Sequence, residues 1–249
     1  MKKITIAYML GVTLSGCGGG GTVSDIATQP IILKTFSNGS GVVVGSPDLG
    51  SAGGPSNLVI AASDVEVAAE VAGGTLALTA TGQTVDGKYY IVTREGTASN
   101  GVSLTVVTEG ITLSEDLREY TAMSLVTINN ELGLTSSGSK PTNLPTGTHS
   151  YTGYAVVSAA SEAGNGTVTL TANFNERIAN VAANIPANSA SGNSNAYFFS
   201  ANGMNINVRD GSFSTANARI GEVGKSPYTA NIKGYFAGSN AKGAHGLVY

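Results

Sequence analysis

The chain has 249 residues, of which 34 are Gly, 7 are Pro and 1 is Cys, and charged residues make up only 12%. Gly is about twice as frequent as its usual ~7% share and charge is about half its usual ~25%, which excludes collagen, coiled coils and charge-driven disorder. The 13 basic and 16 acidic residues give a net charge of −3, so nucleic acid is not an expected partner. The composition indicates a Gly-rich all-β protein.

The N-terminus carries the features of an export signal. Two lysines precede an apolar run at residues 4–14, which is too short to span a bilayer, because a transmembrane helix needs ~20 residues. Residues 14–17, Leu-Ser-Gly-Cys, follow directly and resemble a bacterial lipobox, in which the Cys is acylated and becomes the first mature residue. We therefore predict a lipoprotein signal peptide at residues 1–16 and lipidation of Cys17, with palmitate among the acyl chains.

Acylation determines where the body of the protein sits. Each buried methylene contributes ~0.8 kcal/mol, so two or three acyl chains on Cys17 hold a protein at a bilayer where one does not. Removing residues 1–16 deletes two lysines and changes the net charge from −3 to −5, so anionic head groups add no attraction. Residues 17–30 are expected to be the acylated Cys and a flexible tether. Gly18 after the Cys is compatible with outer-membrane sorting, and we expect the anchored body to face the cell exterior.

Residues 31–138 are expected to form an N-terminal β-rich domain. Residues 88–93 and 102–109 are predicted to pair around a turn that ends in Asn-Gly, a hairpin signal. The densest charge lies in residues 113–127, where a solvated turn or one helical turn between strands is favoured over an acidic catalytic site. Residues 135–145 are polar and contain two prolines, which indicates a domain boundary.

Residues 145–249 are expected to form a second β domain. Short runs of alternating apolar residues are separated by Gly, Asn and Ser turns, and in one of them Val168 and Leu170 share a face while Thr167 and Thr169 share the other. Evenly spaced runs of this kind favour a meander that closes into an antiparallel barrel. The predicted runs are residues 151–157, 167–174, 178–185, 196–199, 204–208, 212–220, 228–236 and 246–249.

Three segments of this C-terminal region carry a family pattern. Residues 147–153 (Gly-Thr-His-Ser-Tyr-Thr-Gly) fit an opening Gly-x-x-x-Tyr-x-Gly strand, and residues 172–175 (Ala-Asn-Phe-Asn) fit a strand end before a hairpin. Residues 234–241 (Gly-Tyr-Phe-Ala-Gly-Ser-Asn-Ala) approximate Gly-x-Phe-x-Gly-x-x-Ala. These segments resemble the barrel domain of the transferrin-binding protein B and factor H-binding protein superfamily of Gram-negative surface lipoproteins.

The resemblance implies a fold and a class of function. It implies an all-β protein with an N-terminal β-rich, handle-like domain followed by an up-and-down antiparallel β-barrel of about eight strands. Lys242 and Gly243 stand where the family usually has an acidic residue, and its final aromatic strand is represented by residues 246–249. The barrel is therefore expected to close either on this short strand or on a run from upstream.

The lipobox and the resemblance together predict a non-enzymatic surface lipoprotein. It would bind a host or environmental ligand, either an iron-carrier protein, another protein or haem, through barrel and handle loops. The alternatives are a passive envelope lipoprotein without a specific ligand and a lipocalin-like carrier of a small molecule in the barrel lumen. No cofactor is expected.

The sequence offers few candidates for chemistry. No Ser lies in a Gly-x-Ser-x-Gly elbow, His149 and His245 are interpreted as solvated turn histidines, and two His with one Cys supply no obvious zinc ligand set. We predict no catalytic residue and no metal site. In the aromatic cluster Tyr197-Phe198-Phe199, alternate side chains face opposite sides, so the outward member is the candidate ligand contact. Phe198 is preferred for that position and Tyr197 is the second candidate.

Overall fold

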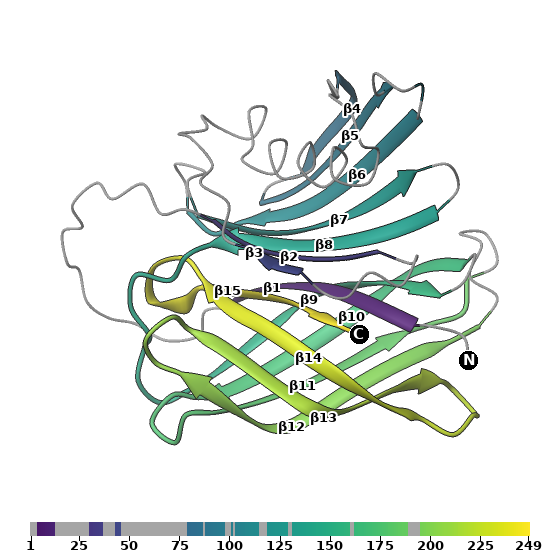
Figure 1. The fold of residues 1–249 in the computed structure, drawn as a ribbon. Helices are drawn as coiled ribbons and strands as arrows, with labels where there is room; N and C mark the ends of the chain where they lie inside the picture. Colours follow the sequence, from purple (N-terminus) through teal and green to yellow (C-terminus); the bar gives the residue numbers. More distant parts are fainter. Residues whose placement is uncertain are drawn as a thin grey trace.

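The computed structural model describes residues 4–12, 30–36, 43–45, 79–86, 88–97, 101, 103–114, 119–128, 131–159, 162–188 and 195–249. These residues form two antiparallel β-sheets, one of which closes into a barrel while the other lies across one wall of it (Figure 1). Cys17 and most of the predicted tether lie outside the described residues.

The barrel has the strand order β1-β15-β14-β13-β12-β11-β10-β9. Each strand from β9 to β15 pairs antiparallel with the next one along the chain. The predicted all-β fold with an up-and-down barrel of eight strands is thus confirmed. The seven consecutive strands are β9 (Thr148–Ala159), β10 (Glu162–Asn173), β11 (Ile178–Ile185), β12 (Tyr197–Asn207), β13 (Ser212–Glu222), β14 (Tyr228–Ala237) and β15 (Gly243–Val248).

The eighth barrel strand comes from the N-terminus. β1 (Ile4–Val12) lies between β9 and β15 and is antiparallel to both (Figure 1). All nine of its residues pair with β9, and the six from Ile6 to Gly11 also pair with β15. An upstream run therefore closes the barrel, which was one of the two expected routes. This run lies inside the segment 1–16 that the sequence predicts to be a signal peptide.

Two of the predicted barrel runs are a single strand. Residues 196–199 and 204–208 were expected to be separate, whereas β12 continues from Tyr197 to Asn207. The register of β11 against β12 shifts where Asn202 and Gly203 oppose only Asn180, and Gly203 has a φ of +68°. The Asn180 side chain accepts a hydrogen bond from the Gly203 N–H at 2.8 Å. The Asn-Gly pair that indicated a turn is thus a bulge inside one strand.

The other sheet has the strand order β3-β2-β8-β7-β6-β5-β4. We call it the first sheet. β5 and β6 pair from Thr97 opposite Ser103 onward, which confirms the predicted hairpin. β8 continues to Ser139, so the predicted boundary segment 135–145 begins within this strand. The chain leaves the sheet only after Ser139. The strands are β2 (Pro30–Phe36), β3 (Val43–Gly45), β4 (Thr79–Asp86), β5 (Tyr89–Thr97), β6 (Ser103–Thr112), β7 (Tyr120–Ile128) and β8 (Glu131–Ser139).

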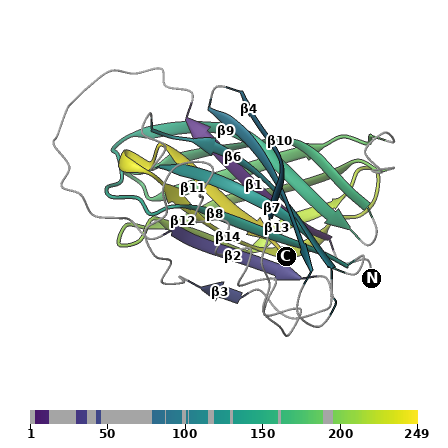
Figure 2. The same cartoon turned by 90° about the horizontal axis from the view of Figure 1, so that it is seen from above.

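This first sheet covers the barrel wall that contains β1. β7 and β8 contact both β1 and β15, and from above the strands of the first sheet cross those of the barrel at an angle (Figure 2). Apolar side chains from both layers are buried where they meet, which joins the two sheets through a second core outside the barrel. This inter-sheet core contains Met123, Leu134, Tyr235 and Leu247.

A carboxylate adds a polar link between the layers. Glu119, at the start of β7, accepts hydrogen bonds from the N–H of Ser239 at 2.7 Å and from its hydroxyl at 3.1 Å. Lys242 Nζ lies 3.3 Å from the same carboxylate. Ser239 belongs to a short 3₁₀ turn, η3 (Ser239–Ala241), before β15. Glu119 was expected in a solvated turn and instead ties the first sheet to the barrel.

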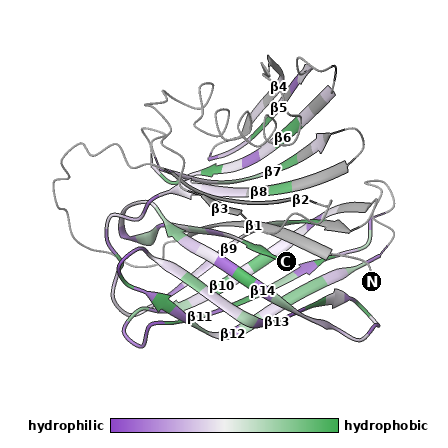
Figure 3. Cartoon of the chain, viewed as in Figure 1, coloured by the Kyte–Doolittle hydropathy of each residue, from purple (hydrophilic) through white to green (hydrophobic). Residues whose placement is uncertain are grey.

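Aromatic side chains fill the barrel interior. The Phe236 ring lies at the centre of this group, with its centroid 4.9 Å from that of Phe174, 5.1 Å from Phe213 and 5.7 Å from Tyr151. Buried and exposed positions alternate along β11 as expected for a strand with one face in the core. Apolar residues are interspersed with polar ones along the barrel strands accordingly (Figure 3).

Gly234 permits a close approach between β14 and the core. A Cβ at this position would lie 2.4 Å from Phe213 Cζ and 2.8 Å from the carbonyl oxygen of His245. We predict that Gly234→Ala lowers the free energy of unfolding by ~1–3 kcal/mol through overpacking, measured by urea denaturation. Gly82→Ala is the matched control, because its Cβ would meet nothing nearer than Thr93 Cβ at 3.9 Å. Equal losses in the two variants would contradict the packing explanation.

Candidate functional site

A pocket opens between the first sheet and the barrel wall. It has a volume of about 200 Å³ and is bounded by β6, β7 and β8 on one side and by β9 and β10 on the other. Its walls are mainly apolar, and Glu109 and Asn165 supply polar side chains. We call it the inter-sheet pocket. The lining residues are Val107, Glu109, Met123, Ser124, Leu125, Leu134, Val156, Gly164 and Asn165.

Strand register gathers these residues on one face. Val107 lies opposite Leu125, Glu109 lies opposite Met123, and Leu125 lies opposite Leu134 in the next strand. Directly paired residues of antiparallel strands point to the same side of the sheet. The face of β6, β7 and β8 that meets the barrel therefore carries these apolar residues around the pocket, together with the half-buried Glu109 and with Ser136, which lies opposite Met123.

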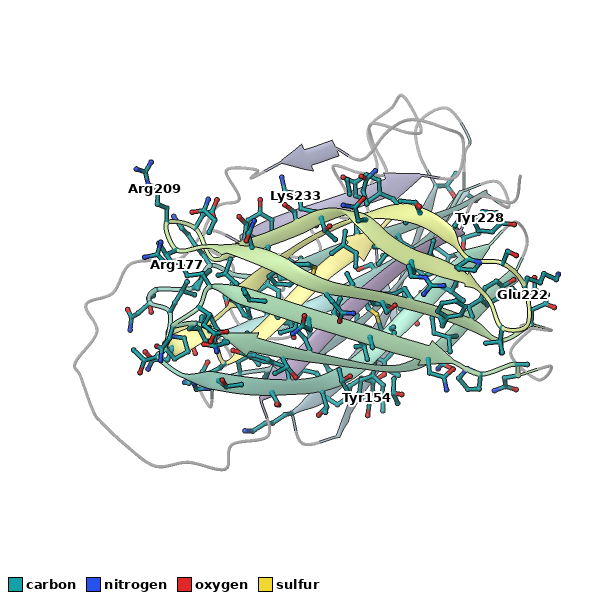
Figure 4. The ribbon with its side chains drawn as sticks, turned by 90° about the horizontal axis from the view of Figure 1, so that it is seen from below. Tyr154, Arg177, Arg209, Glu222, Tyr228 and Lys233 are labelled. Atoms are coloured by element: carbon teal, nitrogen blue, oxygen red, sulfur yellow. The ribbon has the colours of Figure 1, made fainter. Side chains whose placement is uncertain are left out.

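Two tyrosines and Glu109 stand beside the pocket. The Tyr89 hydroxyl donates to Glu109 Oε2 at 2.9 Å, and the Tyr89 ring centroid lies 5.3 Å from that of Tyr154. Burial, and then the negative charge of Glu109, raises the pKa of Tyr89 above its usual range. Tyr154 is 45% exposed on β9 and points away from the barrel (Figure 4). Each layer thus contributes one aromatic ring at this edge.

The size and chemistry of the pocket limit what it can hold. Small-molecule sites are commonly ~300–1,000 Å³, so a volume of about 200 Å³ suits one large apolar side chain or a fragment of similar size. The Glu109 carboxylate can accept a hydrogen bond from a donor carried by the ligand. No local sequence motif marks this site, because its residues come from five strands.

The predicted contact residues lie elsewhere, on β12. Tyr197 is 1% exposed and belongs to the barrel core, whereas Phe198 is half-buried on the outer surface, as expected for alternating positions. A Cβ on Gly221 would lie 3.5 Å from Phe198 Cε1, so the ring covers the backbone of β13. Val223 and Tyr228, which the sequence did not single out, are 56% and 46% exposed at the neighbouring turn. Ligand contact by Phe198 or Tyr197 stays a prediction.

Charged side chains lie at both ends of the barrel. Arg177 and Arg209 lie at one end, and Glu222 and Tyr228 lie at the other (Figure 4). Within the described ranges, no group of three or more His, Cys, Asp or Glu residues is placed to hold a metal ion. A search of the same ranges finds no helix with the length and apolar character needed to cross a membrane.

His245 is fully buried, contrary to the expectation of a solvated turn. It lies on β15, with its Nδ1 3.1 Å from Ser136 Oγ of β8 and its ring stacked on Tyr235 at 6.0 Å. Its Nε2 has no hydrogen-bond partner among the described residues. Burial lowers the pKa of His245 to about 3, so the ring is neutral at pH 7. His149, by contrast, is half-buried and lies 3.0 Å from the Thr146 carbonyl.

We predict that His245 makes the stability of the protein depend on pH. Its pKa is about 3 when folded and ~6.5 when unfolded, so the unfolded chain takes up the proton first. The stability that this residue provides is complete above pH ~6.5 and is lost as pH falls toward ~3. Between about pH 7 and about pH 4.5 the loss should reach roughly 2–3 kcal/mol.

Thermal melts of two variants test this assignment. His245→Gln removes the titrating ring and keeps a hydrogen-bonding group, so its Tm should fall less between the two pH values than that of the unchanged protein. His149→Gln is the matched control and should follow the unchanged protein. The assignment fails if both variants respond to pH alike.

Comparisons with protein families and with curated proteins give no match for this chain. No protein-family model matches it, and no curated protein matches its sequence. The resemblance to surface lipoproteins therefore stays a prediction, and the function has to be inferred from the chain's own residues.

Proposed function

We propose that this chain is a lipoprotein that is anchored in the outer membrane through Cys17 and faces the cell exterior. The observation that supports this is the Leu-Ser-Gly-Cys sequence at residues 14–17, which directly follows an apolar run and contains the only Cys of the chain. A lone thiol in an exported protein has no internal disulfide partner. Acylation would give the Cys17 thiol a role, as the attachment point of the lipid anchor.

The body of this lipoprotein binds a protein ligand and has no enzymatic activity. The inter-sheet pocket supports the binding role, because it is a small apolar recess between two layers with a carboxylate and an amide among its lining side chains. A volume of about 200 Å³ favours an inserted side chain over haem. The mature net charge of −5, obtained by removing Lys2 and Lys3 from −3, leaves recognition to apolar and hydrogen-bonding contacts, so salt should have little effect.

The alternative functions receive less support. A lipocalin-like carrier needs an open lumen, whereas Phe174, Phe213 and Phe236 pack against one another inside the barrel. A passive envelope lipoprotein would need no recess between its layers. It remains the outcome if no ligand is captured.

The anchor is tested by replacing the acylated thiol. We predict that Cys17→Ser abolishes partitioning into the detergent phase of a phase-separating detergent, because no acyl chain can be attached. Mass spectrometry of the N-terminal peptide of the unchanged protein should show residue 17 as the first residue, carrying acyl chains. If Cys17→Ser still partitions with detergent, Cys17 is not the anchor.

The ligand is sought with the detergent-solubilised protein, by capture from serum and from haem-loaded medium. We predict that Asn165→Trp weakens binding of the captured partner at least about tenfold, because the indole covers the mouth of the pocket. Asn165→Ala is the matched control and should bind nearly as well as the unchanged protein. The chain contains no Trp, so the emission of the introduced indole also reports directly on occupancy of the pocket.

Phe198→Ala distinguishes the pocket from the outer wall of the barrel. A tenfold loss in this variant with an unchanged melt, together with full binding by Asn165→Trp, would move the interface to β12. A large drop in Tm would instead show that Phe198 is a packing residue.

A further inference from the structure

The strand that closes the barrel lies in the segment that the proposed processing removes. β1 spans Ile4–Val12, whereas cleavage before Cys17 releases residues 1–16. We propose that the processed protein presents a strand-shaped acceptor groove between β9 and β15, and that this groove binds an extended, uncharged, apolar segment of a partner protein by strand addition. This inference rests on the proposed processing at Cys17 and names a partner class for the body that processing exposes.

The remaining seven strands cannot close in the same way. β9 to β15 alternate in direction, so the first and the last of them run parallel to each other. Antiparallel closure therefore needs one further strand that is antiparallel to both, and β1 meets this requirement. Without it, β9 and β15 each present a row of unpaired N–H and C=O groups, which are costly when buried and are templates for another strand.

Direct pairing of β9 with β15 is opposed by the first sheet. Such pairing would be parallel and would shift one strand by about one inter-strand spacing, ~4.8 Å. β15 is held to β8 through the contact between His245 and Ser136, and the turn before it is held by Glu119. A displacement of this size breaks these contacts, so the groove keeps the width of one strand.

The groove dictates the chemistry of its occupant. The backbone of Ile6 is paired with Val157 and Val248, which are buried in the barrel core. The backbone of the next residue, Ala7, is paired with Val156 and Leu247, which pack in the inter-sheet core. A strand in this position is buried on both faces, so it must be apolar at both alternating sets of positions. A charged side chain there would lose its hydration without a partner.

The groove adjoins the inter-sheet pocket at β9. Val156, opposite Ala7, also lines the pocket, and Met123 and Leu134 line the pocket while belonging to the inter-sheet core. One partner segment can therefore pair with β9 and β15 through its backbone and place a flanking side chain in the pocket. This is strand addition with side-chain specificity from an adjoining recess.

The test uses the processed protein, purified from membranes in detergent, with its N-terminus established by mass spectrometry. The probe is a synthetic peptide with the sequence of residues 4–12 and a lysine tail for solubility. We expect one peptide to bind per chain and the Tm to rise with peptide concentration, since the peptide binds only the folded chain. The same peptide with Ile6→Pro lacks a backbone N–H at a position that pairs with both β9 and β15, and it should bind at least about tenfold more weakly.

The full chain with Cys17→Ser is the matched protein control. It is not processed, keeps residues 1–16 attached, and should not bind the peptide because β1 occupies the groove in cis. Processed protein that shows neither binding nor a Tm shift overturns the groove and leaves the anchor standing. Equal binding of the two peptides shows adsorption without strand pairing and also overturns it. Purified protein that retains residues 1–16 overturns both the proposed processing and the proposed groove, because β1 then still occupies the position between β9 and β15.

Discussion

Pairing of the backbone on both edges of every barrel strand is the constraint on which the rest of this structure depends. The seven strands β9 to β15 alternate in direction, so the free edges of β9 and β15 have the same direction. β1 pairs antiparallel with both edges and satisfies their backbone groups. The wall where this happens is also the wall that β7 and β8 cover. The strand position between β9 and β15 therefore determines both the closure of the barrel and the floor on which the first sheet rests.

The contact between the layers combines apolar area with a few directional bonds. The inter-sheet core supplies the buried surface, and the Ser136–His245 and Glu119–Ser239 contacts set how the layers are aligned. Gly138 allows this approach, since a Cβ there would lie 2.6 Å from His245 Cδ2. The two walls of the inter-sheet pocket belong to different sheets, so the width of the pocket depends on these contacts between the layers.

The alternation of apolar and polar residues along the sequence predicts much of the barrel but little of the inter-sheet pocket. β10 and β11 can be recognised in the sequence because apolar residues recur at every second position, and these positions are buried in the structure. The hairpin of β5 and β6 can be recognised through its turn. Gly203 imitates a turn inside β12 because a bulge and a turn use the same residue types. His245 stands among glycines, yet its burial results from β8, more than a hundred residues away in sequence. The pocket likewise depends on strand register, and its only local sign is Glu109, the one charged residue of β6.

The N-terminal run illustrates why composition alone does not separate two roles. A strand buried on both faces is a continuous apolar stretch, and so is the central region of a signal peptide. Residues 4–12 contain no charged residue, which fits both the apolar region of the proposed signal peptide and a strand position between β9 and β15. The demand for an uncharged strand arises from Val157 and Val248 on one side and from Val156 and Leu247 on the other. The chemistry of whatever segment lies there is thus set by the barrel and the first sheet rather than by the N-terminus itself.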